Sequence, residues 1–178
     1  MKGQPVVMLG DSLTEGGDWR RAFSRAEVRN LGIGGDTWAG VWGRLEEVVR
    51  LKPAQIFLMI GINDLLRGAL PEEIVAGHVC IWEELAAKLP TAALRVESLL
   101  PYLEAALPGL PSNLDIIWIN ERLAEEAGKR SLEFIDLFSL MADPDRQLAL
   151  DYTSDGLHLT PAAYQVWADR IRPLIESA

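Results

Sequence analysis

The chain has 178 residues, of which 49% are hydrophobic and 24% charged, the composition of an ordinary globular protein with room for a sizeable core. We therefore predict a single domain over residues 1–178. The net charge of −9 argues against nucleic acid or an anionic membrane surface as the main partner. The one cysteine, Cys80, excludes an internal disulfide, and its apolar helical surroundings predict a buried side chain.

The first apolar stretch is too short to act as a signal peptide, because it ends at Asp11. No later stretch approaches the length of a membrane span. We expect a cytoplasmic protein with no membrane span. No feature of the sequence predicts an oligomeric state.

Five short apolar runs recur along the chain with helical segments between them. They are Val6–Leu9, Val28–Leu31, Ile56–Ile60, Leu94–Leu99 and Leu132–Leu137. Runs of this length are typical of strands that are buried on both faces. Strands that alternate with helices over a whole small domain indicate a parallel sheet with helices on both sides. The sequence therefore predicts an α/β fold.

The segments between these runs show helical spacing of apolar residues, as in Trp38, Trp42, Leu45 and Val49. The last helix has the clearest start, with Thr160 as the N-cap and Pro161 at the first helical position. We expect it to continue to about Ile175. The stretch Leu100–Asn113 contains three prolines and is predicted to be a long loop.

Gly10, Asp11 and Ser12 follow the first predicted strand directly. Ser12 and Glu15 fit a capping box, in which the two side chains satisfy free N–H groups at a helix start. Gly16-Gly17 would end such a helix after about one turn, so capping explains Ser12 poorly. The alternative is a serine presented at the carboxyl end of a parallel strand, where open α/β sheets place their ligands.

A serine hydroxyl needs a base to become a good nucleophile, and the chain has two histidines. His78 lies in the middle of a predicted helix, and we expect it to be a packing residue with a satisfied ring nitrogen. His158 follows Asp155 by three residues, and Gly156 between them permits a tight turn. A carboxylate this close can hold the imidazole in one tautomer. The same residues also fit an ordinary turn before the last helix.

Two further segments follow predicted strands and carry possible hydrogen-bond donors. Gly35 lies in a glycine pair after the second strand, and Asn63 follows the third. A backbone N–H at Gly35 and a side-chain amide at Asn63 can stabilise the oxyanion that forms in acyl transfer. Both segments also fit ordinary turns, with Asp36 or Thr37 capping the next helix.

Four short segments together resemble the ordered blocks of the GDSL, or SGNH, hydrolases. They are "GDSL" at Gly10–Leu13, the glycine of "GGDT" at Gly35, "GIND" at Gly61–Asp64 and "DGLH" at Asp155–His158. The resemblance spans nearly the whole chain, and the order of the blocks makes it more specific than any one of them. "LRVESLLP", Leu94–Pro101, more weakly resembles the branch related to platelet-activating-factor acetylhydrolases.

This resemblance implies a flavodoxin-like three-layer α/β/α sandwich around a central, mainly parallel five-stranded sheet. It implies Ser12 as the nucleophile and His158 as the base, with Asp155 orienting the histidine. The oxyanion hole would consist of the Ser12 N–H, the Gly35 N–H and the Asn63 side chain. Members of the family hydrolyse esters or thioesters and need no metal or other cofactor. The expected partner is a small-molecule ester.

Other functions fit the sequence less well. An α/β-hydrolase would carry G-x-S-x-G around its nucleophile, and Thr14 replaces the second glycine. A dinucleotide-binding fingerprint fails because Thr37 stands where its third glycine should be. A non-catalytic binding module of the same fold and an acyltransferase using the same acyl-enzyme stay open. The short connections between elements, with no segment for a lid domain, favour short acyl groups.

Overall fold

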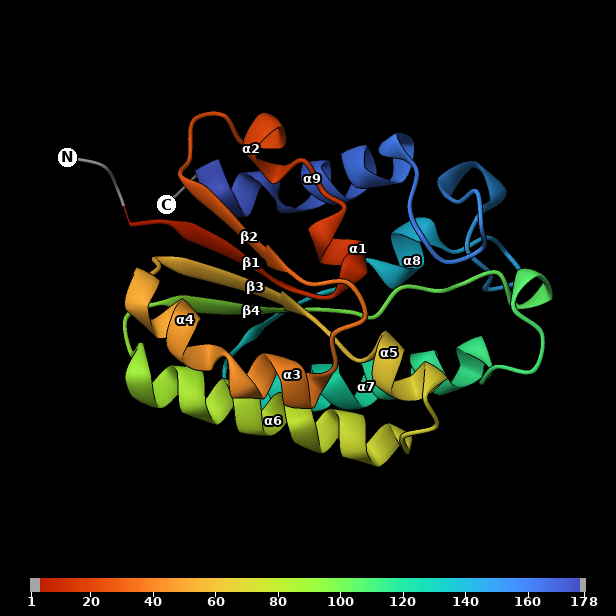
Figure 1. Ribbon diagram of the computed structural model, residues 1–178, viewed down its shortest axis with the longest axis horizontal. Helices are drawn as coiled ribbons and strands as arrows, with labels where there is room; N and C mark the ends of the chain where they lie inside the picture. The colour runs from red at the N-terminus through yellow and green to blue at the C-terminus, as the bar shows by residue number, and fades with distance from the viewer. Residues whose placement is uncertain (1–3, 177–178) are drawn as a thin grey trace.

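A computed structural model describes residues 4–176 of the chain (Figure 1). Its five strands are β1 (Val6–Gly10), β2 (Val28–Gly32), β3 (Gln55–Met59), β4 (Ala93–Glu97) and β5 (Glu133–Ile135). All five run parallel in one sheet, in the order β2-β1-β3-β4-β5. The five predicted strands are therefore confirmed, with boundaries shifted by one or two residues.

The helices lie on both faces of this sheet. They are α1 (Ser12–Glu15), α2 (Trp19–Ala22), α3 (Trp38–Gly43), α4 (Leu45–Leu51), α5 (Ile62–Leu66), α6 (Pro71–Lys88), α7 (Asn113–Lys129), α8 (Phe138–Met141) and α9 (Pro161–Glu176). Figure 1 shows α1, α2, α8 and α9 on one side of the sheet and α3, α4, α6 and α7 on the other. This is the predicted three-layer α/β/α sandwich, with an entirely parallel sheet.

The central strands are buried along their whole length. Every residue of β1 and β3 is buried, because helices cover both faces of the sheet and leave no side exposed to water. This explains why these strands read as continuous apolar runs instead of alternating patterns. The expected last helix is also confirmed: Pro161 opens α9, and the Thr160 hydroxyl accepts a hydrogen bond from the Ala163 N–H at 3.4 Å.

The strand register brings three loops to the same edge of the sheet. Gly10, the last residue of β1, is paired with Gly32 of β2 and Met59 of β3. The chain leaves β1 for β2 on one side and later returns to β3 on the other, so this edge is a topological switch point. Residues just beyond these three strand ends must therefore lie close together.

The predicted loop after β4 is present and contains one short 3₁₀ helix, η1 (Glu104–Ala106). The loop is anchored at both ends by buried asparagines. Asn120 exchanges two hydrogen bonds with the backbone of Leu99, and Asn113 does the same with Tyr102. Since Tyr102 is fully buried, this loop belongs to the core as much as to the surface.

A buried carboxyl group joins the sheet to α9. Glu97 at the end of β4 is 1% exposed, and its Oε1 accepts a hydrogen bond from the Trp167 indole N–H at 2.7 Å. Burial raises the pKa of Glu97 to about 8, although the bond from Trp167 opposes the shift. The side chain is therefore uncharged at neutral pH and pairs with Trp167 as a neutral acid.

This raised pKa predicts that Glu97 makes the fold less stable as the pH rises. The unfolded chain loses the Glu97 proton near pH 4.5, whereas the folded chain keeps it until about pH 8. Protonated Glu97 contributes its full stabilisation below the pKa of the unfolded chain. As the pH rises from there to the pKa of the folded chain, the free energy of unfolding falls by up to ~1.4 kcal/mol per pH unit. In urea unfolding at pH 5, 7 and 9, Glu97→Gln should gain stability relative to the wild type as the pH rises. Parallel pH curves for the two proteins would contradict this.

Candidate active site

Ser12 lies two residues beyond β1, at the first position of the single-turn helix α1. The residue that caps this helix is Asp11, whose Oδ1 accepts a hydrogen bond from the Leu13 N–H at 2.9 Å. The Ser12 hydroxyl is therefore not used as a cap, and its Oγ lies 3.2 Å from His158 Nε2. The Tyr164 hydroxyl donates to the Leu13 carbonyl at 2.9 Å, which fastens α1 to α9.

His158 and Asp155 form a tight unit in the loop before α9. The His158 Nδ1 lies 2.7 Å from Asp155 Oδ2, while Asp155 Oδ1 accepts from the backbone N–H groups of Leu157 and His158 at 2.9 and 2.8 Å. The side-chain bond to His158, followed by the Leu157 N–H, holds the pKa of the Asp155 carboxyl well below its usual range. Asp155 is therefore an ionised acceptor that can orient the imidazole with Nε2 toward Ser12.

The loop after β4 supports this turn. Gly156 has φ = +93°, and a β-carbon there would lie 2.5 Å from the Ala106 side chain, so only glycine fits without displacement. The Gly156 carbonyl accepts from the Leu103 N–H at 2.7 Å. Thr153 pairs with Leu159 in an antiparallel bridge that closes the turn. Two segments that are distant in sequence thus hold the histidine in place.

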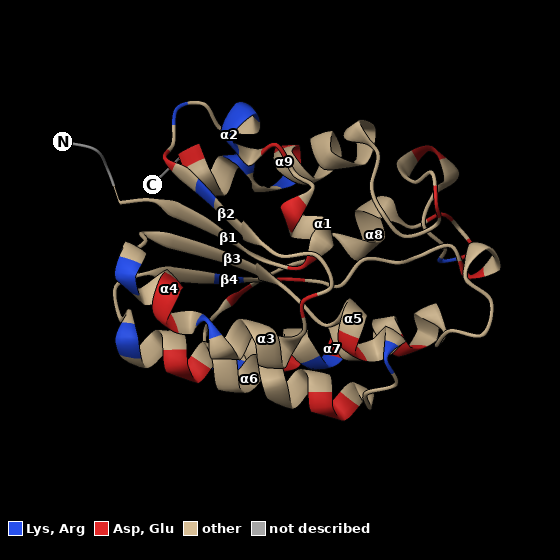
Figure 2. Cartoon of the chain, in the orientation of Figure 1, with Lys and Arg blue, Asp and Glu red and all other residues tan. Residues whose placement is uncertain are grey.

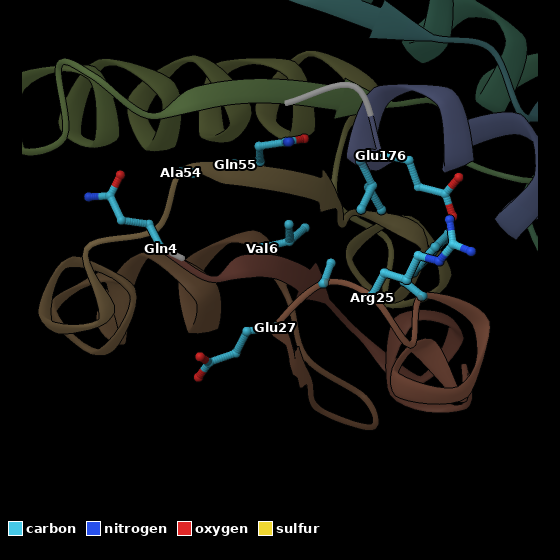
Figure 3. A pocket seen from close by; sticks show the side chains of 10 residues that line it. Gln4, Val6, Arg25, Glu27, Ala54, Gln55 and Glu176 are labelled. Atoms are coloured by element: carbon cyan, nitrogen blue, oxygen red, sulfur yellow. The ribbon is translucent and has the colours of Figure 1, made fainter. Parts of the chain in front are cut away.

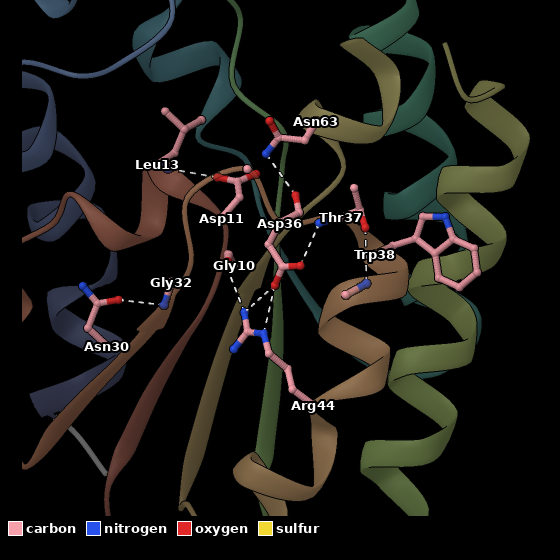
Figure 4. A network of polar contacts seen from close by, with 12 residues as sticks. Gly10, Asp11, Leu13, Asn30, Gly32, Asp36, Thr37, Trp38, Arg44 and Asn63 are labelled. Carbon is pink, nitrogen blue, oxygen red and sulfur yellow. Dashed lines mark hydrogen bonds and ion pairs between the residues drawn. The ribbon is translucent and has the colours of Figure 1, made fainter. Parts of the chain in front are cut away.

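Gly35 and Asn63 lie together at the neighbouring strand ends. Gly35 has φ = +73°, a left-handed conformation that suits glycine, in a turn closed by the Asp36 N–H and the Ile33 carbonyl at 3.1 Å. The Asn63 Nδ2 donates to the Asp36 carbonyl at 2.9 Å (Figure 4). An amide nitrogen carries two protons, so this bond leaves the second one for a ligand.

An ion pair that the sequence analysis did not identify lies beneath these loops. Arg44 donates through Nε to Asp36 Oδ2 at 2.9 Å and through Nη2 to the Gly10 carbonyl at 3.1 Å (Figure 4). The side chains of Arg44 and Asp36 are only 15% and 11% exposed. The pair links the end of β1 to the turn that contains Gly35. No local motif identifies it, because Arg44 meets Gly10 across 34 residues of sequence.

Asp11 is the second unforeseen feature. Its side chain is fully buried beside Ser12, and burial raises its pKa to about 7, with the Leu13 N–H acting in the opposite direction. The charges of Asp36 and Asp64 add to the increase. A carboxyl group that is half-protonated near neutral pH therefore lies directly before the candidate nucleophile.

The other histidine takes no part in this cluster. His78 is fully buried in α6, and its Nε2 lies 2.8 Å from the Ile60 carbonyl, which confirms the prediction of a packing residue. Burial lowers the pKa of His78 to about 4, so it is neutral.

The prediction for Cys80 was wrong: its side chain is exposed, because it faces away from the side of α6 that packs against the sheet.

The cluster around Ser12 is open to solvent, with the side chains of His158 and Asp155 51% and 52% exposed. A cavity of about 530 Å³ lies elsewhere, at the opposite ends of β1 and β3, where Gln4, Val6 and Gln55 line it (Figure 3). That cavity has no nucleophile–base pair among its lining residues. The candidate site is therefore the exposed cluster and not this cavity.

Charged residues of both signs are distributed over the helices of both helical layers (Figure 2). Within residues 4–176, no helix combines the length and the apolar character that crossing a membrane requires. The same part of the chain contains no group of three or more His, Cys, Asp or Glu side chains placed to hold a metal ion.

The conformation of Gly35 leads to a prediction about stability. Gly35→Ala should destabilise the fold by about 1 kcal/mol or more, because alanine disfavours φ = +73°, although its β-carbon would come no closer than 3.5 Å to Arg67. Gly43→Ala is the matched control, since a β-carbon at Gly43 meets nothing within 4 Å and no positive φ applies there. Urea unfolding should show a loss for the first variant and none for the second. Equal stabilities would contradict the strained turn.

The chain is similar to several known proteins. Platelet-activating factor acetylhydrolase IB subunit alpha2 of Rattus norvegicus is 29% identical over 170 residues, which cover 92% of this chain and 72% of that protein. The N-acylneuraminate cytidylyltransferase of Streptococcus agalactiae is 27% identical over 175 residues, and the match covers 94% of this chain but only 40% of that protein. A GDSL-like lipase from Bacteroides thetaiotaomicron has the same fold, with a TM-score of 0.86, 24% identity and coverage of 98% and 88% of the two chains. Residues 8–166 match the GDSL-like Lipase/Acylhydrolase family, and the chain therefore belongs to this family of ester hydrolases.

Proposed function

We propose that the protein is a serine ester hydrolase that acts through an acyl-enzyme on Ser12. The observation that carries the proposal is the continuous chain of contacts from Ser12 Oγ to His158 Nε2 at 3.2 Å and from His158 Nδ1 to Asp155 Oδ2 at 2.7 Å. Nucleophile, base and orienting carboxylate stand in the relation that acyl transfer requires. Membership of an acylhydrolase family supports the same chemistry.

The reaction would proceed in two halves. His158 Nε2 takes the proton of Ser12 as its Oγ attacks the acyl carbon, and Asp155 stabilises the imidazolium. The Ser12 N–H, the Gly35 N–H and the free proton of the Asn63 amide stabilise the oxyanion. The intermediate collapses, and the leaving alcohol receives the proton from His158. Water then attacks the acyl-enzyme, gives its proton to His158 and releases the acid, while the proton returns to Ser12.

The exposure of the site supports small acyl groups and water as the acceptor. The side chains of His158 and Asp155 are each about half exposed, so water can reach the acyl-enzyme. Of the apolar residues in the surrounding loops, Tyr102, Met141 and Leu148 are fully buried in the core and so cannot line an acyl channel, whereas Leu110, Leu140 and Leu150 are exposed. The rat relative is named for the removal of an acetyl group, which is the shortest common acyl group.

The nucleophile is tested by active-site labelling. A fluorophosphonate should add one equivalent to Ser12 and abolish hydrolysis of p-nitrophenyl acetate, and Ser12→Ala should prevent both. Ser139→Ala, which removes an exposed serine elsewhere, is the matched control and should label and react normally. Mass spectrometry of the peptides identifies the modified residue. Stoichiometric labelling of another residue would rule out Ser12 as the nucleophile.

The acyl preference is tested with p-nitrophenyl esters from acetate to palmitate, below their aggregation limits. We expect kcat/KM to be highest between acetate and about butyrate. In a deep channel, the burial of each added CH₂ would stabilise the bound ester by about 0.8 kcal/mol, and kcat/KM would rise roughly fourfold per methylene. A maximum at octanoate or beyond would show an acyl channel and overturn the short-chain assignment.

Added alcohols should yield little transesterified product, and efficient transfer would instead favour an acyltransferase.

A further inference from the structure

Side chains of the short helix α5 and of Arg67, which directly follows it, contact the backbone at residues 35, 36 and 38. Asn63 Nδ2 donates to the Asp36 carbonyl at 2.9 Å, and Asp64 Oδ2 accepts from the Trp38 N–H at 3.0 Å. The third contact comes from Arg67, whose Nη2 donates to the Gly35 carbonyl at 2.8 Å. Figure 4 shows Asn63 reaching down from its helix to Asp36.

The spacing of these side chains explains why α5 and its C-cap residue Arg67 can make such a set of contacts. Asn63 and Arg67 are four residues apart, so their side chains emerge on the same face of the helical turn. They donate to the carbonyls of Gly35 and Asp36, which are adjacent in sequence. Two successive peptide groups are therefore held from the same side, one by an amide and one by a guanidinium.

The Gly35 peptide needs such support more than an ordinary turn does. Glycine moves between left-handed and right-handed conformations at little cost, so φ = +73° at Gly35 is not maintained by the residue itself. A donor on its carbonyl favours one orientation of the backbone. An oxyanion hole stabilises the transition state only when its donors are already aligned.

We propose that Arg67 is a positioning residue, which keeps the Gly35 backbone in the orientation that directs its N–H to the oxyanion. The inference rests on the proposed function, in which Gly35 is an oxyanion donor. Arg67 acts through Gly35 and does not itself contact the substrate. The Gly35 N–H stabilises the oxyanion, which exists only in the transition state and the intermediate. Loss of Arg67 therefore lowers kcat and leaves KM nearly unchanged.

The kinetic test uses Arg67→Ala and Arg67→Lys with p-nitrophenyl acetate. Arg67→Ala should lower kcat about 10-fold, less than the 10²–10³ expected for removing an oxyanion donor outright. Arg67→Lys should recover part of this loss, because lysine keeps the charge but lacks the planar guanidinium. Affinity for a boronic acid that forms a tetrahedral adduct with Ser12 should fall in parallel with kcat/KM.

A matched control exists on the opposite layer of the molecule. Arg172 also donates to a backbone carbonyl, that of Ala22, at 2.9 Å. Arg172→Ala should leave kcat and boronate affinity unchanged. The amide signal of Gly35 in ¹⁵N-glycine-labelled protein should shift or broaden in Arg67→Ala and not in Arg172→Ala. This spectroscopic measurement does not depend on activity.

The outcomes separate the inference from the proposed function. Normal kcat and an unchanged Gly35 signal in Arg67→Ala, with Ser12 still labelled by fluorophosphonate, would overturn the inference alone. A rise in KM confined to anionic esters would also overturn it, because Arg67 would then be a substrate-binding residue. Failure of the wild type to label at Ser12 would instead refute the proposed function.

Discussion

The parallel pairing of β1 with both β2 and β3 is the constraint on which the candidate site depends. This register ends three strands at one level, with Gly10 beside Gly32 and Met59. Ser12, Gly35 and Asn63 follow these ends within two to four residues, so they lie together without any long excursion of the chain. A shift of one strand relative to β1 would separate the hydroxyl from its neighbouring donors.

Polar groups below the surface connect these loops, and some of them are costly to bury. Arg44 links the end of β1 to Asp36, and Asn63 and Arg67 donate to backbone carbonyls of the same turn. Asp11 and Glu97 have raised pKa values because burial disfavours their charged forms. Together these contacts indicate a site whose geometry is maintained by its supporting groups, while the groups proposed to react remain open to water.

Local patterns predicted most of the fold correctly because they follow from burial alone. Continuous apolar runs marked all five strands, and the Thr160-Pro161 pair marked the start of α9. Cys80 was placed wrongly because helical spacing does not show which side of α6 faces the sheet. The capping role of Asp11 was also missed, since Ser12 and Glu15 offered a competing capping pattern one residue later.

Short-range patterns of apolar residues, glycine and proline were enough to predict the α/β class and to place each strand to within two residues. The order of blocks also indicated the family. Which of these residues come into contact depends on how the elements pack. The contact of Ser12 with His158 spans 146 positions and that of Arg67 with Gly35 spans 32. Contacts of this kind follow from strand register and loop packing, which no local pattern specifies.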